Sequence, residues 1–144
     1  MNVFFVFDDG TLQTPPLTGT ILPGVTRDSL ITLGRDLGLT VGEQPYAIDE
    51  WQADATSGRL GEAFACGTAA VITPIGKVKG KSRAFTIGDG EPGPLTQRLK
   101  AALTDIQFGR APDPHGWREQ LFCTCARMGA PIVSIGRTDG IRRA

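Results

Sequence analysis

The hydrophobic pattern begins with a strand-like run and continues with a helical stripe. Val3–Phe7 is a continuous run of β-branched and aromatic residues, which is typical of a buried strand. Asp8-Asp9-Gly10 is a hairpin turn signal, so we expect residues 11–14 to pair back on that strand. A helix that opens at Thr26 and stops at Gly38 is then predicted by three leucines at helical spacing, Leu30, Leu33 and Leu37.

The middle of the chain predicts short alternating elements. Leu39–Ile48 has the pattern of a strand, and Asp49 is a candidate N-cap for a short helix that closes near Gly58. Two apolar runs, residues 63–66 and 70–75, flank Gly67-Thr68. We expect them to be two strands that meet at a functional turn.

The clearest helical periodicity lies near the C-terminal side, between Pro94 and Gly109. Before it, Phe85–Ile87 predicts a strand, and the basic segment 77–83 predicts a solvated hairpin tip. One face of the helix carries Leu95, Leu99, Ala102, Leu103 and Ile106. The whole pattern predicts an α/β fold in which helices flank a mixed sheet.

Two turns of small residues carry the candidate chemistry. Leu22–Arg27 opens the first predicted helix, and Phe64–Ala70 contains the Gly67-Thr68 turn. Backbone N–H groups at such places lack intrachain partners and can be offered to an anion, so the two turns can share one phosphate. Taken alone, each also fits an ordinary connection between elements.

The order of three segments resembles a known enzyme family. Residues 14–27 (TPPLTGTILPGVTR), residues 67–70 (GTAA) and residues 103–110 (LTDIQFGR) are similar, in this order, to segments of the branched-chain amino acid aminotransferases. These are fold-type-IV enzymes that depend on pyridoxal 5'-phosphate. The resemblance covers residues 1–117 and implies part of their large, cofactor-binding domain. Residues 118–144 lose the family pattern, and we expect a divergent, poorly ordered tail.

The resemblance implies a role for each residue of the two turns. The backbone amides of Val25 and Thr26, together with Thr68, would bind the cofactor phosphate, and Leu22 would pack on the face of the cofactor ring. The amides of Thr68 and Ala69 would receive the α-carboxylate of the substrate. The intact relatives are homodimers that move an amino group between leucine, isoleucine or valine and 2-oxoglutarate. The resemblance does not match Arg27 to their phosphate-binding arginine.

No catalytic residue is assigned within the chain. In the family, the lysine that forms the Schiff base and the glutamate that binds the pyridine nitrogen come before the position matched by Met1. The chain therefore resembles a C-terminal fragment of the large domain. We interpret its four lysines, Lys77, Lys79, Lys81 and Lys100, as solvated surface charges. We predict that the isolated chain does not transaminate.

Composition narrows the possible partners. Fifteen basic and 15 acidic residues are interspersed and give a formal net charge of zero, which argues against a nucleic-acid partner. The apolar opening is too short and wrongly flanked for a signal peptide or a membrane span, so we expect a cytoplasmic protein. Three cysteines and one histidine, with Cys123 and Cys125 one residue apart, do not form a zinc set, and we expect no metal.

Two alternatives stay open at this point. Other fold-type-IV enzymes, such as D-amino acid aminotransferases and aminodeoxychorismate lyases, share the general phosphate turn, although residues 14–17 and 105–110 argue against them. The other alternative is a non-catalytic module that binds a small anion or associates with full-length subunits.

Overall fold

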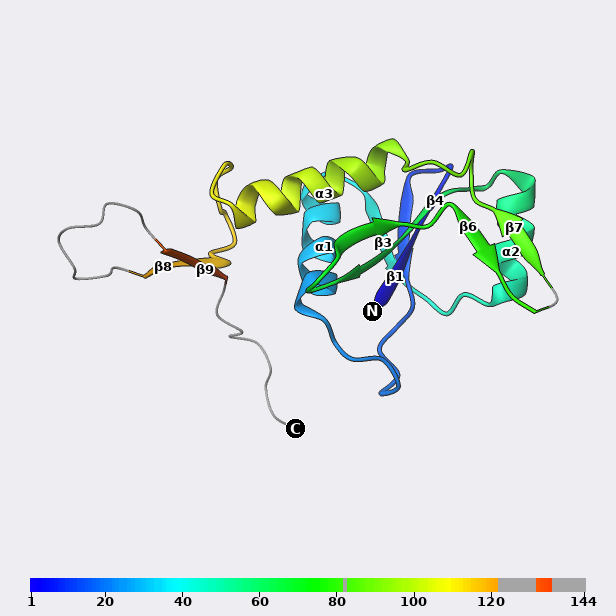
Figure 1. The fold of residues 1–144 in the computed structure, drawn as a ribbon, viewed down its shortest axis with the longest axis horizontal. Helices are drawn as coiled ribbons and strands as arrows, with labels where there is room; N and C mark the ends of the chain where they lie inside the picture. The colour runs from blue at the N-terminus through cyan, green and yellow to red at the C-terminus, as the bar shows by residue number, and fades with distance from the viewer. Residues whose placement is uncertain (82, 122–131, 136–144) are drawn as a thin grey trace. The chain divides into compact units, whose positions relative to one another are not determined.

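The computed structural model describes residues 1–81, 83–121 and 132–135 (Figure 1). The chain divides into two compact units between Ala101 and Ala102, inside the last helix. In chain order the elements are β1 (Asn2–Phe7), β2 (Thr11–Thr14), α1 (Val25–Asp36), β3 (Thr40–Glu43), α2 (Ile48–Ser57), β4 (Leu60–Gly67), β5 (Val71–Pro74), β6 (Lys77–Lys79), β7 (Ala84–Thr86), α3 (Pro94–Gln107), β8 (Arg118–Leu121) and β9 (Ile132–Ile135).

A five-stranded mixed sheet organises the first unit, with the strand order β3-β2-β1-β4-β5. Strand β1 is antiparallel to both of its neighbours, with Phe5 opposite Gln13 on β2 and Phe4 opposite Phe64 on β4. Strand β3 joins the edge of β2 in parallel. The predicted hairpin over residues 3–14, the strands on both sides of Gly67-Thr68, and the α/β class with a mixed sheet and flanking helices are confirmed.

Helix α1 covers one face of this sheet. Alternate residues of β1 point to opposite faces, and Phe4 on the α1 side stacks on Phe64 with 5.2 Å between the ring centroids. The helix approaches closely because Gly34 has no side chain, and a Cβ there would lie 3.0 Å from the side chains of both Leu12 and Val41. This packing fixes the position of α1, and hence of its first turn, on the sheet.

The other face carries a cluster of aromatic residues beneath α2 and the β6–β7 hairpin. Phe5 makes edge contacts with Tyr46 and Trp51, at centroid distances of 4.6 and 4.9 Å. Trp51 in turn makes an edge contact with Phe85 on β7, with 5.8 Å between the ring centroids. Figure 1 accordingly shows α1 and α2 on opposite sides of the central strands. The sheet is therefore covered on both faces, and its backbone is a rigid support for the turns at its ends.

The segment between β2 and α2 differs from its prediction. The strand predicted over 39–48 ends at Glu43, because Pro45 has no N–H to continue the ladder. The predicted N-cap at Asp49 is also wrong, since α2 begins at Ile48 after the N-cap Ala47. The carboxylate of Glu50 accepts a hydrogen bond of 2.8 Å from the Ala47 amide, so the helix start is fixed by this glutamate.

The helix ends and the long periodic helix agree with the sequence. Gly38 and Gly58 adopt the left-handed backbone that stops α1 and α2, with φ of 78° and 84°. Helix α3 covers the predicted periodic segment, and its residues Leu99, Leu103 and Ile106 are buried. The basic segment after β5 is partly strand, because Lys77–Lys79 pairs antiparallel with β7.

The N-terminus of α3 is capped by a side chain from β4. The carboxylate of Glu62 accepts hydrogen bonds from the Leu95 amide at 3.0 Å and from the Thr96 amide at 2.7 Å. A Cβ at Gly93 would collide with this carboxylate, so the glycine makes room for the cap. The amides that an isolated helix leaves without acceptors are thus satisfied within the fold.

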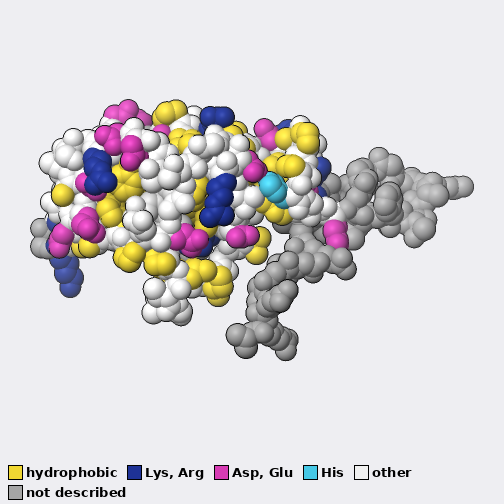
Figure 2. Space-filling view, turned by 180° about the vertical axis from the view of Figure 1, so that it is seen from behind, with side chains coloured by type: hydrophobic (Ala, Val, Ile, Leu, Met, Phe, Trp, Pro, Cys, Tyr) yellow, Lys and Arg dark blue, Asp and Glu magenta, His cyan; other side chains and the backbone are white. Residues whose placement is uncertain are grey.

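Within the predicted tail, β8 and β9 pair antiparallel, with Arg118 opposite Ile135. The rest of that tail lies outside the described residues, and so do Cys123 and Cys125, so the tail boundary stays a prediction. In the described part of the chain no helix is long and apolar enough to cross a bilayer. Figure 2 shows acidic and basic side chains interspersed on one face of the molecule.

Candidate functional site

The first turn of α1 offers backbone amides that have no acceptor. The helix starts after Gly24, an extended residue with φ −90° and ψ 134°, and its first backbone hydrogen bond runs from the Asp28 amide to the Gly24 carbonyl at 3.1 Å. Glycine has no side chain with which to cap the helix. Among the described residues, none accepts a hydrogen bond from the amides of Val25 and Thr26. This helix end can therefore bind an anion.

The turn between β4 and β5 is the second candidate. Thr68 and Ala69 are exposed, and their amides make no hydrogen bond to a described residue. The turn closes at Val71, whose φ of 53° lies in the left-handed region. A tight hairpin normally places glycine at such a position, and a β-branched residue is strained there. Sequence reasoning missed this strain, because a valine at the start of an apolar run only predicts a strand.

Asn2, at the start of β1, lies between the two turns. Its partner across the sheet is Cys66, the residue directly before Gly67. Its Nδ2 amide donates a long hydrogen bond of 3.5 Å to the Leu22 carbonyl, and a Cβ at Gly24 would lie 2.8 Å from the same nitrogen. The two turns are thus brought to the same end of the β1–β4 pair, beside the start of α1 (Figure 1). Asn2 was not among the predicted site residues.

Exposed apolar residues belong to, or lie next to, the two turns. The side chain of Leu22 is 83% exposed, that of Val25 is 60% exposed and that of Met1 is 82% exposed. A Cβ on Gly67 would be 3.5 Å from the Met1 side chain, so Met1 lies against the second turn. The candidate site therefore combines free N–H donors with an exposed apolar rim, a combination that suits a flat ring carrying an anionic group.

A buried cation follows directly after Thr26. Arg27 is 4% exposed, and its Nη2 donates to the Pro15 carbonyl at 2.9 Å and to the Glu43 carboxylate at 2.6 Å. Burial raises the pKa of the Cys66 thiol to about 11, although the positive charges of Arg27 and of the N-terminal amine act in the opposite direction. Cys66 is therefore a buried, protonated thiol at neutral pH.

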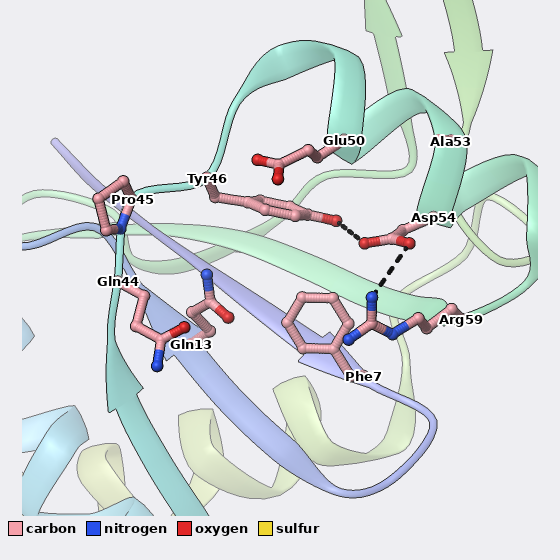
Figure 3. A pocket seen from close by; sticks show the side chains of 9 residues that line it. All are labelled: Phe7, Gln13, Gln44, Pro45, Tyr46, Glu50, Ala53, Asp54 and Arg59. Atoms are coloured by element: carbon pink, nitrogen blue, oxygen red, sulfur yellow. Dashed lines mark hydrogen bonds and ion pairs between the residues drawn. The ribbon is translucent and has the colours of Figure 1, made fainter.

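A separate hollow of about 290 Å³ lies at the other end of β1 (Figure 3). Tyr46 donates a hydrogen bond of 2.8 Å to Asp54, and Arg59 contacts the same carboxylate at 3.4 Å. Burial, together with the bond to Asp54, raises the pKa of the Tyr46 hydroxyl. This network ties α2 to the strands on either side of it. None of the predicted site residues lines the hollow, which we interpret as part of the fold.

Comparisons with solved structures define the class of protein. A branched-chain amino acid aminotransferase from Escherichia coli is 40% identical to the chain, with a TM-score of 0.67 over 81% of this chain and 36% of that one. The enzyme of the same name from Thermoproteus uzoniensis, solved with norvaline, is 36% identical, with a TM-score of 0.62 over 76% of this chain and 32% of that one. The chain therefore has the fold of part of a fold-type-IV aminotransferase.

The profile of the amino-transferase class IV family matches residues 1–78, and the chain belongs to this family. A branched-chain-amino-acid aminotransferase of Mycolicibacterium smegmatis is 52% identical over 124 residues, which cover 84% of this chain and 34% of that relative. A probable enzyme of the same name from Streptomyces coelicolor is 53% identical over 121 residues, 84% of this chain and 33% of the relative. The chain thus spans about a third of the length of these relatives.

Proposed function

We propose that the chain is the part of a branched-chain amino acid transaminase that binds the cofactor phosphate and the substrate carboxylate. The reaction would move an amino group between leucine, isoleucine or valine and 2-oxoglutarate. The observation that carries this proposal is the presence, at one end of the sheet and on both sides of Asn2, of two sets of amides that bond to none of the described residues. The names of the relatives support the same activity.

The donor set fits pyridoxal 5'-phosphate. The amides of Val25 and Thr26, with Thr68, would hold the phosphate, because a helix N-terminus attracts an anion and these N–H groups have no competing acceptor in the described part of the chain. Leu22 would lie against the ring, which agrees with its exposure. When bound, the cofactor supplies an electron sink for the chemistry at the amino acid's α-carbon.

The turn after β4 would orient the substrate. The amides of Thr68 and Ala69 are fixed donors for an α-carboxylate, since the turn is held between two paired strands. Small side chains allow a ligand to approach this backbone closely, and the paired strands β4 and β5 hold Val71 in its left-handed conformation. These residues bind and orient; they transfer no proton.

None of the 144 residues is assigned as the lysine that would form the Schiff base, so the chain by itself should not transaminate. The test incubates the purified chain with pyridoxal 5'-phosphate, leucine and 2-oxoglutarate and measures glutamate. We expect none above a blank without protein. Glutamate formed in proportion to the chain concentration would contradict this prediction and would require a catalytic lysine among Lys77, Lys79, Lys81 and Lys100.

We further propose that the complete enzyme acts as a homodimer in the cytoplasm. The names of the relatives favour this transaminase over a D-amino acid aminotransferase or an aminodeoxychorismate lyase. A non-catalytic role in subunit association has no separate observation in its favour. Mixing the chain with an intact relative and measuring co-elution would reveal such association if it occurs.

A further inference from the structure

Arg27 is a charge in an unfavourable position. It lies in the first turn of α1, where the helix dipole disfavours a cation, and it is 4% exposed, so it has also lost most of its hydration. Among the described residues, Arg27 is the only buried residue that carries a full charge. A charge placed against two local preferences indicates a purpose other than the stability of the helix.

Two segments hold this guanidinium in place. Its Nη2 bonds the carbonyl of Pro15, where the loop to α1 begins, and the carboxylate of Glu43, at the end of β3. Glu43 is 42% exposed, so water shares its negative charge and it compensates the arginine only in part. The Nε of Arg27 is buried and has no hydrogen-bond partner among the described residues. The side chain is thus fixed, and its positive charge is incompletely neutralised.

The field of this charge reaches both candidate turns. Arg27 follows Thr26 directly in the first turn of α1, so its guanidinium lies no farther than the length of one side chain from the backbone of that turn. It also acts on Cys66, whose thiol pKa it lowers against the larger effect of burial, and Cys66 directly precedes Gly67. Asp28 carries a negative charge in the same helix turn, but it is exposed, so water screens its charge more strongly than that of the buried Arg27.

We propose that Arg27 is a positioning residue that supplies fixed positive charge to an anion bound at the start of α1, without contacting that anion. The inference rests on the proposed function, since it concerns the same phosphate site. The helix dipole and the buried guanidinium then act on the ligand in the same direction, so the charge that is unfavourable for the empty helix end becomes favourable when an anion is bound.

A purely mechanical role makes different predictions. If Arg27 only tied the loop and β3 to α1, a substitution of Arg27 and a substitution of Glu43 would both weaken binding of the anion. If its charge acts on the anion, Glu43→Gln should strengthen binding, because the glutamine oxygen still accepts the hydrogen bond while the opposing negative charge is gone. Arg27→Lys should retain most of the effect, because it keeps the charge and loses only the planar fork.

The experiment titrates the ¹⁵N-labelled 144-residue chain with pyridoxamine 5'-phosphate at constant ionic strength and follows the amide signals of Val25, Thr26 and Thr68. This probe has no aldehyde, so it does not modify surface lysines, and pyridoxamine without phosphate is the ligand control. We expect Arg27→Met to weaken binding about fivefold, Arg27→Lys to stay within about twofold of the wild type, and Glu43→Gln to tighten binding about twofold. Arg35→Met, an exposed change in the last turn of the same helix, should alter nothing.

The outcomes separate this inference from the proposed function. If the wild-type signals do not shift with the probe, both are wrong. If the wild type binds and Arg27→Met binds equally well, only the role of Arg27 is wrong. Weakening by Glu43→Gln, or an Arg27→Lys variant as weak as Arg27→Met, would establish the mechanical role instead and overturn the electrostatic one. Circular dichroism monitors folding, and the two conservative variants decide the question if Arg27→Met does not fold.

Discussion

The N-termini of α1 and α3 both contain backbone amides that have no acceptor within the helix, and the fold treats these amides in opposite ways. In α3, a carboxylate from β4 accepts hydrogen bonds from the amides of Leu95 and Thr96. In α1, which starts after Gly24, no described residue accepts from the amides of Val25 and Thr26. The comparison teaches that the fold spends a side chain of another strand on the start of α3, whereas the start of α1 keeps its donors available to a ligand.

The open end has an energetic cost. A glycine N-cap in place of Ser or Asp loses a few tenths of a kcal/mol, and donors left without acceptors lose more where water is excluded. Helix α2 differs from α3, because Glu50 accepts a hydrogen bond from the amide of the N-cap Ala47 and no described residue accepts one from the amides of Ile48 and Asp49. Helix α1 leaves this stabilisation unused where α3 uses it, which is expected of an end that is available to a ligand.

The largest expected effect comes from removing the side-chain cap at the N-terminus of α3. Glu62→Ala removes the acceptor of two amides in a partly buried setting and should lower the free energy of unfolding by about 2 kcal/mol, measured by urea denaturation. Glu62→Gln, which keeps one acceptor oxygen, should lose about half as much. Glu91→Ala is the control, because Glu91 is exposed. A loss below about 0.5 kcal/mol for Glu62→Ala would contradict the cap.

A smaller effect is expected from blocking the open end. Ala69→Glu places a negative charge and a longer side chain on the second turn, so it should weaken binding of pyridoxamine 5'-phosphate about tenfold or more. Stability should change little, because Ala69 is exposed. The exposed Ala84→Glu on β7 is the matched control. Equal affinity for the two variants would show that the turn after β4 is not part of the site.

The smallest effect should come from relaxing the turn itself. Val71→Gly removes a left-handed strain of about 1–3 kcal/mol but makes the unfolded chain more flexible, so the net gain in unfolding free energy should be about 0.5–1 kcal/mol. Val78→Gly, in ordinary strand geometry on β6, should destabilise instead. A Val71→Gly variant less stable than the wild type would show that the valine contributes packing that outweighs its strain.

Most of the fold could be predicted because its signals are local. The run from Val3, the leucines of α1 and the apolar face of α3 each follow one period, and Gly38 and Gly58 mark helix ends by their left-handed backbone. The strand β3 was predicted too long because its apolar residues continue toward Ile48, and the effect of Pro45 was underestimated. The carboxylate at the start of α2 that bonds the N-cap amide of Ala47 belongs to Glu50, three residues further on, and Asp49 is not the N-cap that the sequence predicted.

The candidate site was predictable only in its parts. The two small-residue turns could be identified along the chain, but their common neighbour Asn2 could not, because the register of β1 with β4 is set across the sheet. Glu62 accepts a hydrogen bond from Leu95, 33 residues further along the chain, and no local pattern predicts that contact. The burial of Arg27 could not be predicted, since no local pattern indicates that a cation in the first turn of a helix is buried.

The parallel pairing of β2 with β3 has a consequence for how the molecule folds. These strands cannot be joined by a tight turn, and their connection runs through the whole of α1. Non-local ladders form late, after the loop entropy of the crossover has been overcome. Pro15 and Glu43, which hold Arg27, lie on either side of that crossover. The binding environment of Arg27 is therefore complete only when this crossover has closed.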